Sequence, residues 1–92
     1  MKIEHDEKRR RFVAQIEGGE AVLDYDRVAD DTLDYKHTFV PPENRGRGIA
    51  GRLVRHALDY ARDNDLKVIP TCPFVAAVIG DYPEYEALIE SS

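Results

Sequence analysis

The sequence predicts one domain of the α+β or α/β class, with a mixed sheet of about four strands, a long crossover helix after the third strand and short C-terminal helices. Three observations predict this order: alternating apolar residues over 11–40, helical spacing from residue 49, and a short apolar run at 66–70. A chain of 92 residues suits one domain and leaves no room for a second, so residues 1–92 are interpreted as one unit. The charged residues 1–10 are expected to be frayed.

The first half of the chain alternates apolar and polar residues with the period of a β-strand. Two runs flank Gly18-Gly19, a dipeptide typical of hairpin turns, so the first two strands are expected to be antiparallel. A third strand is predicted over 32–40 and ends at Pro41-Pro42. The positions predicted to share one side within each strand are Phe12, Ala14 and Ile16, then Ala21, Leu23 and Tyr25, then Leu33, Tyr35, His37 and Phe39.

The second half of the chain begins with a change of period. Ile49, Leu53, Ala57 and Ala61 recur every four residues, which predicts an amphipathic helix over 48–64. The apolar run 66–70 follows as a short strand, and a strand, helix, strand order favours parallel pairing through a right-handed crossover. The run 74–79 is a short helix or a buried turn, and one or two helical turns are expected over 83–89.

Composition excludes several function classes. The 13 Lys and Arg against 18 Asp and Glu give a formal charge of −5, which argues against a general nucleic-acid binder. No apolar run approaches the roughly 20 residues of a membrane span, and no secretory leader follows Met1. The single cysteine cannot form an internal disulfide, and no zinc-ligand spacing occurs, so no metal is expected. We therefore expect a cytoplasmic protein, a monomer or weak dimer, without a membrane or nucleic-acid partner.

The segment 40–51, which reads V-P-P-E-N-R-G-R-G-I-A-G, is a glycine-rich loop between a strand end and a helix start. Such a loop leaves backbone N–H groups unpaired at the positive end of the helix dipole, where an anion can bind. Gly46 and Gly48 allow positive φ, and Arg45 and Arg47 add full charges. The segment lacks the Gly-Lys-Ser/Thr of a Walker loop. An ordinary helix start with solubilising arginines is the alternative.

Residues 45–50 also fit R-x-x-G-x-A, and here the sequence resembles the GNAT superfamily of acetyl-CoA-dependent N-acetyltransferases. The closest resemblance is to a minimal branch of that superfamily, through H-T-x-V-P at 37–41 and V-I-P-x-C-P-F-V at 68–75. The resemblance implies a GNAT-like core, acetyl-CoA as cosubstrate, and transfer of an acetyl group to an unidentified primary amine of a protein, a peptide or a small molecule. A CoA-binding or acyl-CoA-binding module with little or no catalysis is the alternative.

The resemblance also assigns residues to the cofactor. The backbone amides of Arg47, Gly48 and Ala50 are expected to hold the CoA pyrophosphate, with Arg45 and Gly46 completing the loop. The pantetheine arm is expected along the end of the third strand, near Phe39 and Val40, where it splays from the strand that follows the helix. A backbone amide at or before Val40 is then placed to polarise the thioester carbonyl.

Two side chains are candidates for the chemistry of the acyl group. Cys72 directly follows the last strand. It is either a nucleophile that takes the acetyl group or an apolar residue in the wall of the pocket. His37 lies near the end of the third strand, as a base toward the amine or Cys72, or as a hydrogen-bonding residue of the sheet. Tyr82 and Tyr85 are weaker candidates for returning a proton to the CoA thiolate.

Overall fold

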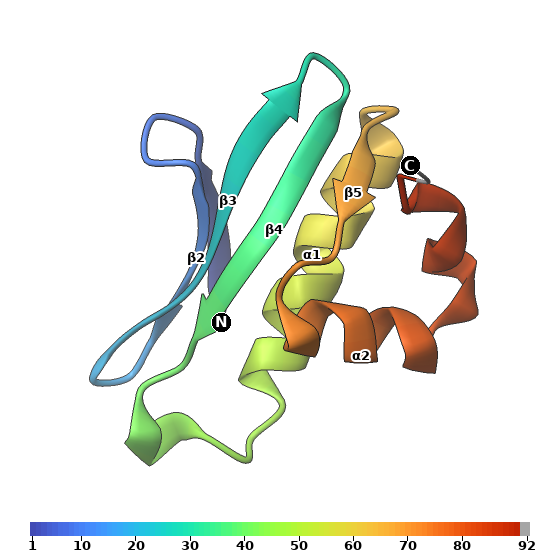
Figure 1. Cartoon of the computed structure of the whole chain (residues 1–92). Helices are drawn as coiled ribbons and strands as arrows, with labels where there is room; N and C mark the ends of the chain where they lie inside the picture. The colour runs from blue at the N-terminus through green and yellow to red at the C-terminus, as the bar shows by residue number, and fades with distance from the viewer. Residues whose placement is uncertain (91–92) are drawn as a thin grey trace.

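The computed structural model describes residues 1–90 and places a five-stranded sheet at the centre of the fold, in the order β1-β2-β3-β4-β5 (Figure 1). The strands β1 to β4 are antiparallel to their neighbours, whereas β5 is parallel to β4, so the predicted mixed sheet is confirmed. The strand bounds are Lys2–Asp6 for β1, Arg11–Ile16 for β2, Gly19–Ala29 for β3, Thr32–Phe39 for β4 and Lys67–Ile69 for β5.

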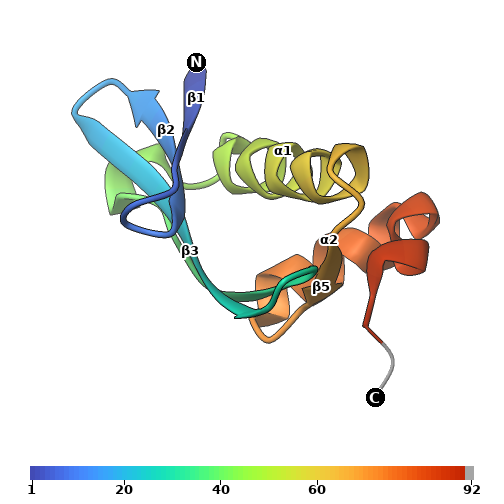
Figure 2. The same ribbon diagram turned by 90° about the horizontal axis from the view of Figure 1, so that it is seen from above.

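Two α-helices and two 3₁₀ segments complete the part of the chain that the structure describes. The crossover helix α1 covers Ile49–Asp63 and α2 covers Pro73–Asp81, while η1 and η2 are short 3₁₀ segments at Pro42–Asn44 and Pro83–Leu88. Figure 2 shows α1 lying within the curve of the sheet, with α2 and the C-terminal segment beside β5. No helix within residues 1–90 is long and apolar enough to cross a membrane.

The core lies between α1 and the inner face of the sheet. The helix buries the apolar stripe that its spacing predicts, because positions three and four apart lie on one face. Tyr35, fully buried on β4, donates its hydroxyl hydrogen to the carbonyl of Ala57 at 2.6 Å, which fixes the sheet against the helix. The fully buried helix residues are Leu53, Val54, Ala57, Leu58 and Ala61.

The N-terminal residues form a strand, so the expectation that residues 1–10 are frayed is wrong and the sheet gains a fifth strand. In β1, Ile3 pairs with Ala14 and His5 pairs with Phe12 of β2. The His5 ring stacks on Phe12 with 4.2 Å between centroids, and its Nε2 lies 2.6 Å from the Tyr25 hydroxyl. An imidazole therefore occupies an inward position of β1. Because histidine is not an apolar residue, the alternating pattern of this strand cannot be recognised in the sequence.

A β-bulge interrupts β4. Tyr25 of β3 pairs with Tyr35, but the preceding residue Asp24 pairs with His37, so Lys36 has no partner of its own. The extra residue shifts the alternation of β4 by one position, because each residue of a strand points to the face opposite its neighbour. The residues that face inward are therefore odd-numbered on one side of the bulge and even-numbered on the other.

The bulge reverses which side chains face inward near the end of β4. Thr38 pairs with Leu23, a fully buried residue of β3, and Val40 just beyond the strand is also buried. His37 and Phe39 are exposed instead. The prediction that His37 and Phe39 share the side of Leu33 is therefore wrong, since sequence alternation alone does not reveal an inserted residue.

The two parallel strands separate soon after they pair. Their last paired residues are Asp34 and Ile69, after which β4 continues without β5 beside it. Beyond β5 the Thr71 hydroxyl donates to the Asp34 carboxylate and the Cys72 N–H donates to the Tyr35 carbonyl at 2.9 Å, and the chain then enters α2. The end of β4 is therefore open along the edge that faces α2.

Candidate functional site

The loop between η1 and α1 depends on two glycines. Gly46 and Gly48 have φ of +83° and +76°, a left-handed conformation that is costly for residues with a Cβ. A Cβ at either position would meet no atom within 4 Å, so backbone conformation and not crowding within the chain requires glycine. Gly48 is also the N-cap residue of α1, and it supplies no side chain to the helix.

The start of α1 therefore lacks the usual capping groups. No side chain within residues 1–90 accepts a hydrogen bond at its N-cap, and its first turn contains no acidic residue. The first N–H groups of a helix have no intrahelical partner, and they carry the positive end of the helix dipole. This end of α1 is consequently suited to an anionic group.

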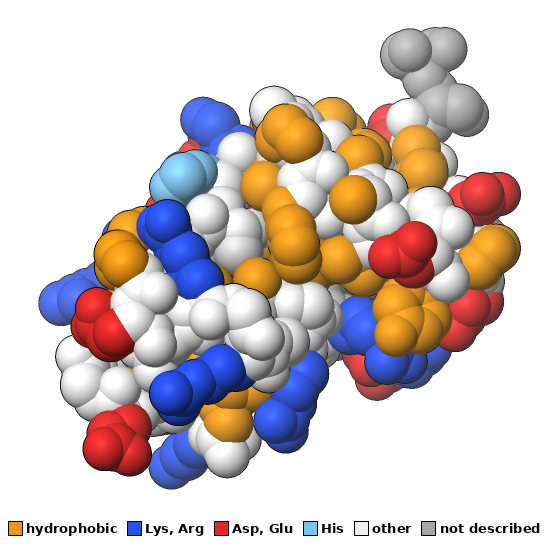
Figure 3. All heavy atoms as spheres, turned by 90° about the horizontal axis from the view of Figure 1, so that it is seen from below, with side chains coloured by type: hydrophobic (Ala, Val, Ile, Leu, Met, Phe, Trp, Pro, Cys, Tyr) orange, Lys and Arg blue, Asp and Glu red, His pale blue; other side chains and the backbone are white. Residues whose placement is uncertain are grey.

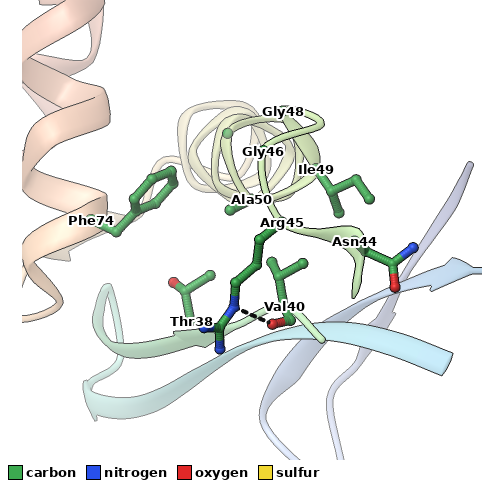
Figure 4. Close-up of a pocket in the computed structure, with 10 residues that line it drawn as sticks. Thr38, Val40, Asn44, Arg45, Gly46, Gly48, Ile49, Ala50 and Phe74 are labelled. Atoms are coloured by element: carbon green, nitrogen blue, oxygen red, sulfur yellow. Dashed lines mark hydrogen bonds between the residues drawn. The ribbon is translucent and has the colours of Figure 1, made fainter. Parts of the chain in front are cut away.

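A cavity of about 420 Å³ lies between this helix start, the end of β4 and α2. Figure 4 shows the side chains of Thr38 on β4, Val40 just beyond it and Phe74 on α2 pointing toward the cavity, and the loop residues lie on its other side. The cavity thus connects the uncapped helix start with the separated strands. Its lining residues are Thr38, Val40, Asn44, Arg45, Gly46, Gly48, Ile49, Ala50, Gly51 and Phe74.

The arginines near the cavity differ from those elsewhere in their partners. Arg47 and Arg52 are exposed and form no ion pair within residues 1–90, whereas Arg11 pairs with Asp24 at 3.2 Å. Arg55 lies 4.0 Å above the ring of Tyr82, a cation–π contact that holds it to the C-terminal segment. Figure 3 shows Lys and Arg side chains spread over the face that includes the loop and the start of α1. Positive charge without a carboxylate partner is therefore available beside the cavity.

Cys72 contacts one of the residues that line the cavity. It is 6% exposed, immediately precedes α2, and its Sγ lies 3.5 Å from the Thr38 hydroxyl. Burial opposes ionisation of the thiol, but hydrogen bonds from the Thr38 hydroxyl and from backbone groups of Val75 and Phe74 outweigh it and lower the Cys72 pKa. The lowered pKa and the position before a helix favour the thiolate form, whereas burial limits access to the sulfur.

The structure brings most of the predicted CoA residues together. Of the seven, the cavity is lined by Val40, Arg45, Gly46, Gly48 and Ala50. The two others, Phe39 and Arg47, are exposed and are not part of the lining.

The two predicted catalytic side chains are separated by the sheet. Cys72 contacts Thr38, which lines the cavity, whereas His37 is exposed and pairs with Asp24 on β3. His37 is not among the residues that line the cavity. The structure therefore places Cys72 beside the cavity and does not bring His37 into it.

The tyrosines considered for proton return lie elsewhere. The buried Tyr85 donates its hydroxyl hydrogen to Asp59 on α1 at 2.7 Å. Tyr82 packs its ring under Arg55. Neither lines the cavity, and both join the C-terminal segment to α1.

Five lining residues were not assigned to the site from the sequence: Thr38, Asn44, Ile49, Gly51 and Phe74. Thr38 was hidden by the bulge, and Phe74, 42% exposed, comes from a helix whose packing the sequence does not reveal. Asn44 is only 5% exposed, with its Nδ2 3.4 Å from the Glu17 carbonyl and its Oδ1 without a partner in the described chain. Its position in a loop after two prolines gave a turn signal only.

The splayed parallel strands, the uncapped helix and the glycine loop define a GNAT-type acetyltransferase fold, and comparison with known proteins identifies the family. A family model described as GCN5-related N-acetyl-transferase matches residues 11–88. The chain belongs to this family and is an N-acetyltransferase by class.

Particular relatives agree with this assignment. Protein NATD1 of Xenopus tropicalis is 40% identical over 85 residues, which cover 90% of this chain and 78% of the relative. Protein NATD1 of Homo sapiens is 39% identical over 85 residues, with 90% of this chain and 75% of the relative covered. An NMR structure of a GCN5-like protein from Staphylococcus aureus superposes with a TM-score of 0.74 at 22% identity, covering 99% of this chain and 89% of the other, and it supports the fold.

Proposed function

We propose that this protein transfers an acetyl group from acetyl-CoA to a primary amine. One observation carries the proposal: a single cavity reaches from the uncapped start of α1 to Thr38, whose hydroxyl contacts Cys72. The first end suits a diphosphate, and at the second the Cys72 thiol lies 3.5 Å from the Thr38 hydroxyl. Membership in the N-acetyltransferase family supports the assignment of acetyl transfer.

In this proposal the loop binds the nucleotide end of CoA. The backbone N–H groups of Arg47, Gly48 and Ala50 hold the diphosphate, and positive φ at Gly48 turns the chain so that these groups face one point. The side chains of Arg45 and Arg47 add charge-assisted contacts. The pantetheine arm then runs beside the end of β4 toward Thr38, in the gap that the early end of β4–β5 pairing leaves.

Cys72 receives the acetyl group in the first step that we propose. Its thiolate attacks the thioester carbonyl, a new carbon–sulfur bond forms, and the CoA thiolate leaves. The neutral amine then attacks the acetyl carbonyl on Cys72, the nitrogen–carbon bond forms, the thiolate of Cys72 is released, and the amine loses its proton to solvent. The lowered pKa of Cys72 favours the first step, because the thiolate is the nucleophilic form.

Calorimetry with acetyl-CoA, CoA and ATP tests the cofactor. We expect both CoA compounds to bind and ATP to bind at least about tenfold more weakly, because only CoA fills the cavity beside β4. Absence of binding for all three compounds would remove the cavity from the hypothesis. Equal affinity for ATP would indicate a general phosphate-binding domain instead.

Mass spectrometry after incubation with acetyl-CoA tests the acyl carrier. The intact protein should gain one acetyl group on Cys72, and an added primary amine such as spermidine or a lysine peptide should remove it. Cys72→Ala should lower amine acetylation by roughly 1,000-fold or more, the scale seen when a covalent nucleophile is removed, while acetyl-CoA affinity stays unchanged. The control is Cys72→Ser, which keeps the volume but not the thiolate. Full turnover of Cys72→Ala would assign Cys72 to packing, and CoA binding without any turnover by the wild type would favour a CoA-binding module.

A further inference from the structure

Arg45 is the charged residue among those that line the cavity, and its side chain crosses the cavity instead of leaving it. Figure 4 shows it reaching from the loop to the end of β4, where its Nε donates to the Val40 carbonyl at 2.9 Å. The bond links the loop before α1 to the end of β4. A guanidinium that only attracts phosphate would not need this contact with a backbone carbonyl.

The contact satisfies a backbone group that needs a partner. Val40 is 8% exposed and lies just past the end of β4, where β5 no longer runs alongside. A carbonyl in such surroundings is costly to leave without a hydrogen bond. In the free protein Arg45 supplies that bond from the cavity side.

A pantetheine arm at this place would need the same carbonyl and the same space. Its amide N–H groups are donors of the kind that pair with a strand edge, and its chain would run between Val40 and α2. Arg45 and the arm therefore compete for one acceptor. Because Arg45 is exposed and is followed by Gly46, its guanidinium can turn back toward the loop.

We propose that Arg45 determines cofactor specificity by making the site discriminate coenzyme A thioesters from phosphate-free pantetheine thioesters. The proposal rests on the proposed function. When acetyl-CoA binds, the displaced guanidinium exchanges a neutral carbonyl for the anionic diphosphate, which is the stronger acceptor. When a phosphate-free thioester binds, the guanidinium loses the Val40 carbonyl and gains only water in its place. The same residue thus favours one ligand and opposes the other.

The test measures the affinities of two ligands, acetyl-CoA and S-acetylpantetheine, for the wild type and for Arg45→Met. Methionine keeps the apolar stem and removes the charged head. We expect Arg45→Met to bind acetyl-CoA about tenfold more weakly, as a charge-assisted contact is lost, and to bind S-acetylpantetheine about threefold more tightly, as the competing hydrogen bond is gone. NMR titration follows the weaker ligand into the millimolar range.

The matched control is Arg47→Met, two residues along the same loop. Arg47 makes no side-chain hydrogen bond or ion pair within residues 1–90 and does not line the cavity. It should weaken acetyl-CoA binding and leave S-acetylpantetheine binding unchanged. Thermal melting of both variants verifies that each is folded.

The sign of the change in S-acetylpantetheine affinity decides the proposal. Tighter binding by Arg45→Met supports it, while weaker, unchanged or undetectable binding in both proteins overturns it, even where acetyl-CoA binds well. Failure of the proposed function has a different result, since the wild type would then bind neither acetyl-CoA nor CoA. A 15N spectrum of the wild type adds a direct measurement: the Arg45 Nε–H signal should shift on addition of acetyl-CoA, because the proton leaves the Val40 carbonyl.

Discussion

The two ends of α1 differ in how their backbone groups are satisfied. At the C-terminal end, Asn64 donates its Nδ2–H to the Tyr60 carbonyl at 2.8 Å, and Arg62 stands in the last turn as the dipole favours. Arg62 also pairs with Asp59 at 3.3 Å, and Tyr85 donates to the same carboxylate. This end is completed by the protein itself.

At the N-terminal end the same helix receives nothing comparable. Gly48 provides no capping side chain, the first turn holds no carboxylate, and Arg47 and Arg52 have no ion-pair partner in the described chain. The protein as a whole carries a net charge of −5, so carboxylates are plentiful and are placed elsewhere. The contrast indicates that one end of α1 serves stability, and it supports the proposal that the other end binds an anionic ligand.

The sharpest way to break this contrast is to disturb Gly48. Gly48→Val should weaken acetyl-CoA binding by about 100-fold, because a β-branched residue resists a φ of +76° and its methyl groups project toward the anion site. Calorimetry gives the affinity. The matched control is Gly18→Val in the β2–β3 hairpin, where φ is +85° and space is also open. It should lower thermal stability similarly but keep acetyl-CoA affinity, and equal binding losses in both variants would contradict a local role for Gly48.

Local chemistry in the sequence was sufficient to predict this N-terminal end. A glycine loop between a strand and a helix determines its own geometry over a few residues, so Arg45, Gly46 and Gly48 could be predicted there. Ala50 was predicted through the resemblance to the GNAT superfamily, and Arg47, predicted on the same local grounds as Arg45, does not line the cavity. The amphipathic spacing of α1 was equally informative, because a helix buries one face whatever its neighbours are.

Features set by pairing between distant strands could not be predicted in this way. The bulge at Lys36 depends on how β4 aligns with β3, and no residue type within β4 indicates it. His5 completes β1 by stacking on a phenylalanine of another strand, although a histidine gives little β signal by itself. The same bulge places Thr38 in the lining of the cavity and puts His37 on the face opposite the predicted one.

The stabilising end of α1 is tested by Tyr85→Phe. The hydroxyl is buried and bonded to a carboxylate, so its loss should cost about 1–2 kcal/mol of unfolding free energy. Urea unfolding measures this, and acetyl-CoA affinity should remain at the wild-type value. Tyr82→Phe is the control, since the contact of Tyr82 with Arg55 uses the ring and not the hydroxyl. A large loss of acetyl-CoA binding in Tyr85→Phe would show that the two ends of α1 are not independent.

The unpaired charges are tested by comparing two arginines at opposite ends of α1. Arg47→Ala should weaken acetyl-CoA binding about fivefold at low salt, and the effect should shrink as added salt screens the exposed charge. Arg62→Ala removes an equal charge that is paired with Asp59 and Asp63, so it should leave the affinity unchanged at every salt concentration. Equal effects of the two substitutions would indicate a general influence of net charge and not a charged site.

The smallest effect is expected from pH, and it belongs to the sheet away from the cavity. Burial lowers the pKa of His5 below its ordinary 6.5 against the opposing pull of Glu7. The unfolded chain therefore binds the proton more readily than the folded one. The contribution of neutral His5 to the free energy of unfolding is full above pH 6.5 and is lost as the pH drops from there through the folded pKa. Urea unfolding between pH 7.5 and 5.5 should show this decline in the wild type and a flatter profile in His5→Phe, which keeps a ring against Phe12. If both profiles fall equally, the pH dependence arises from other groups, and β1 is held by its backbone pairing alone.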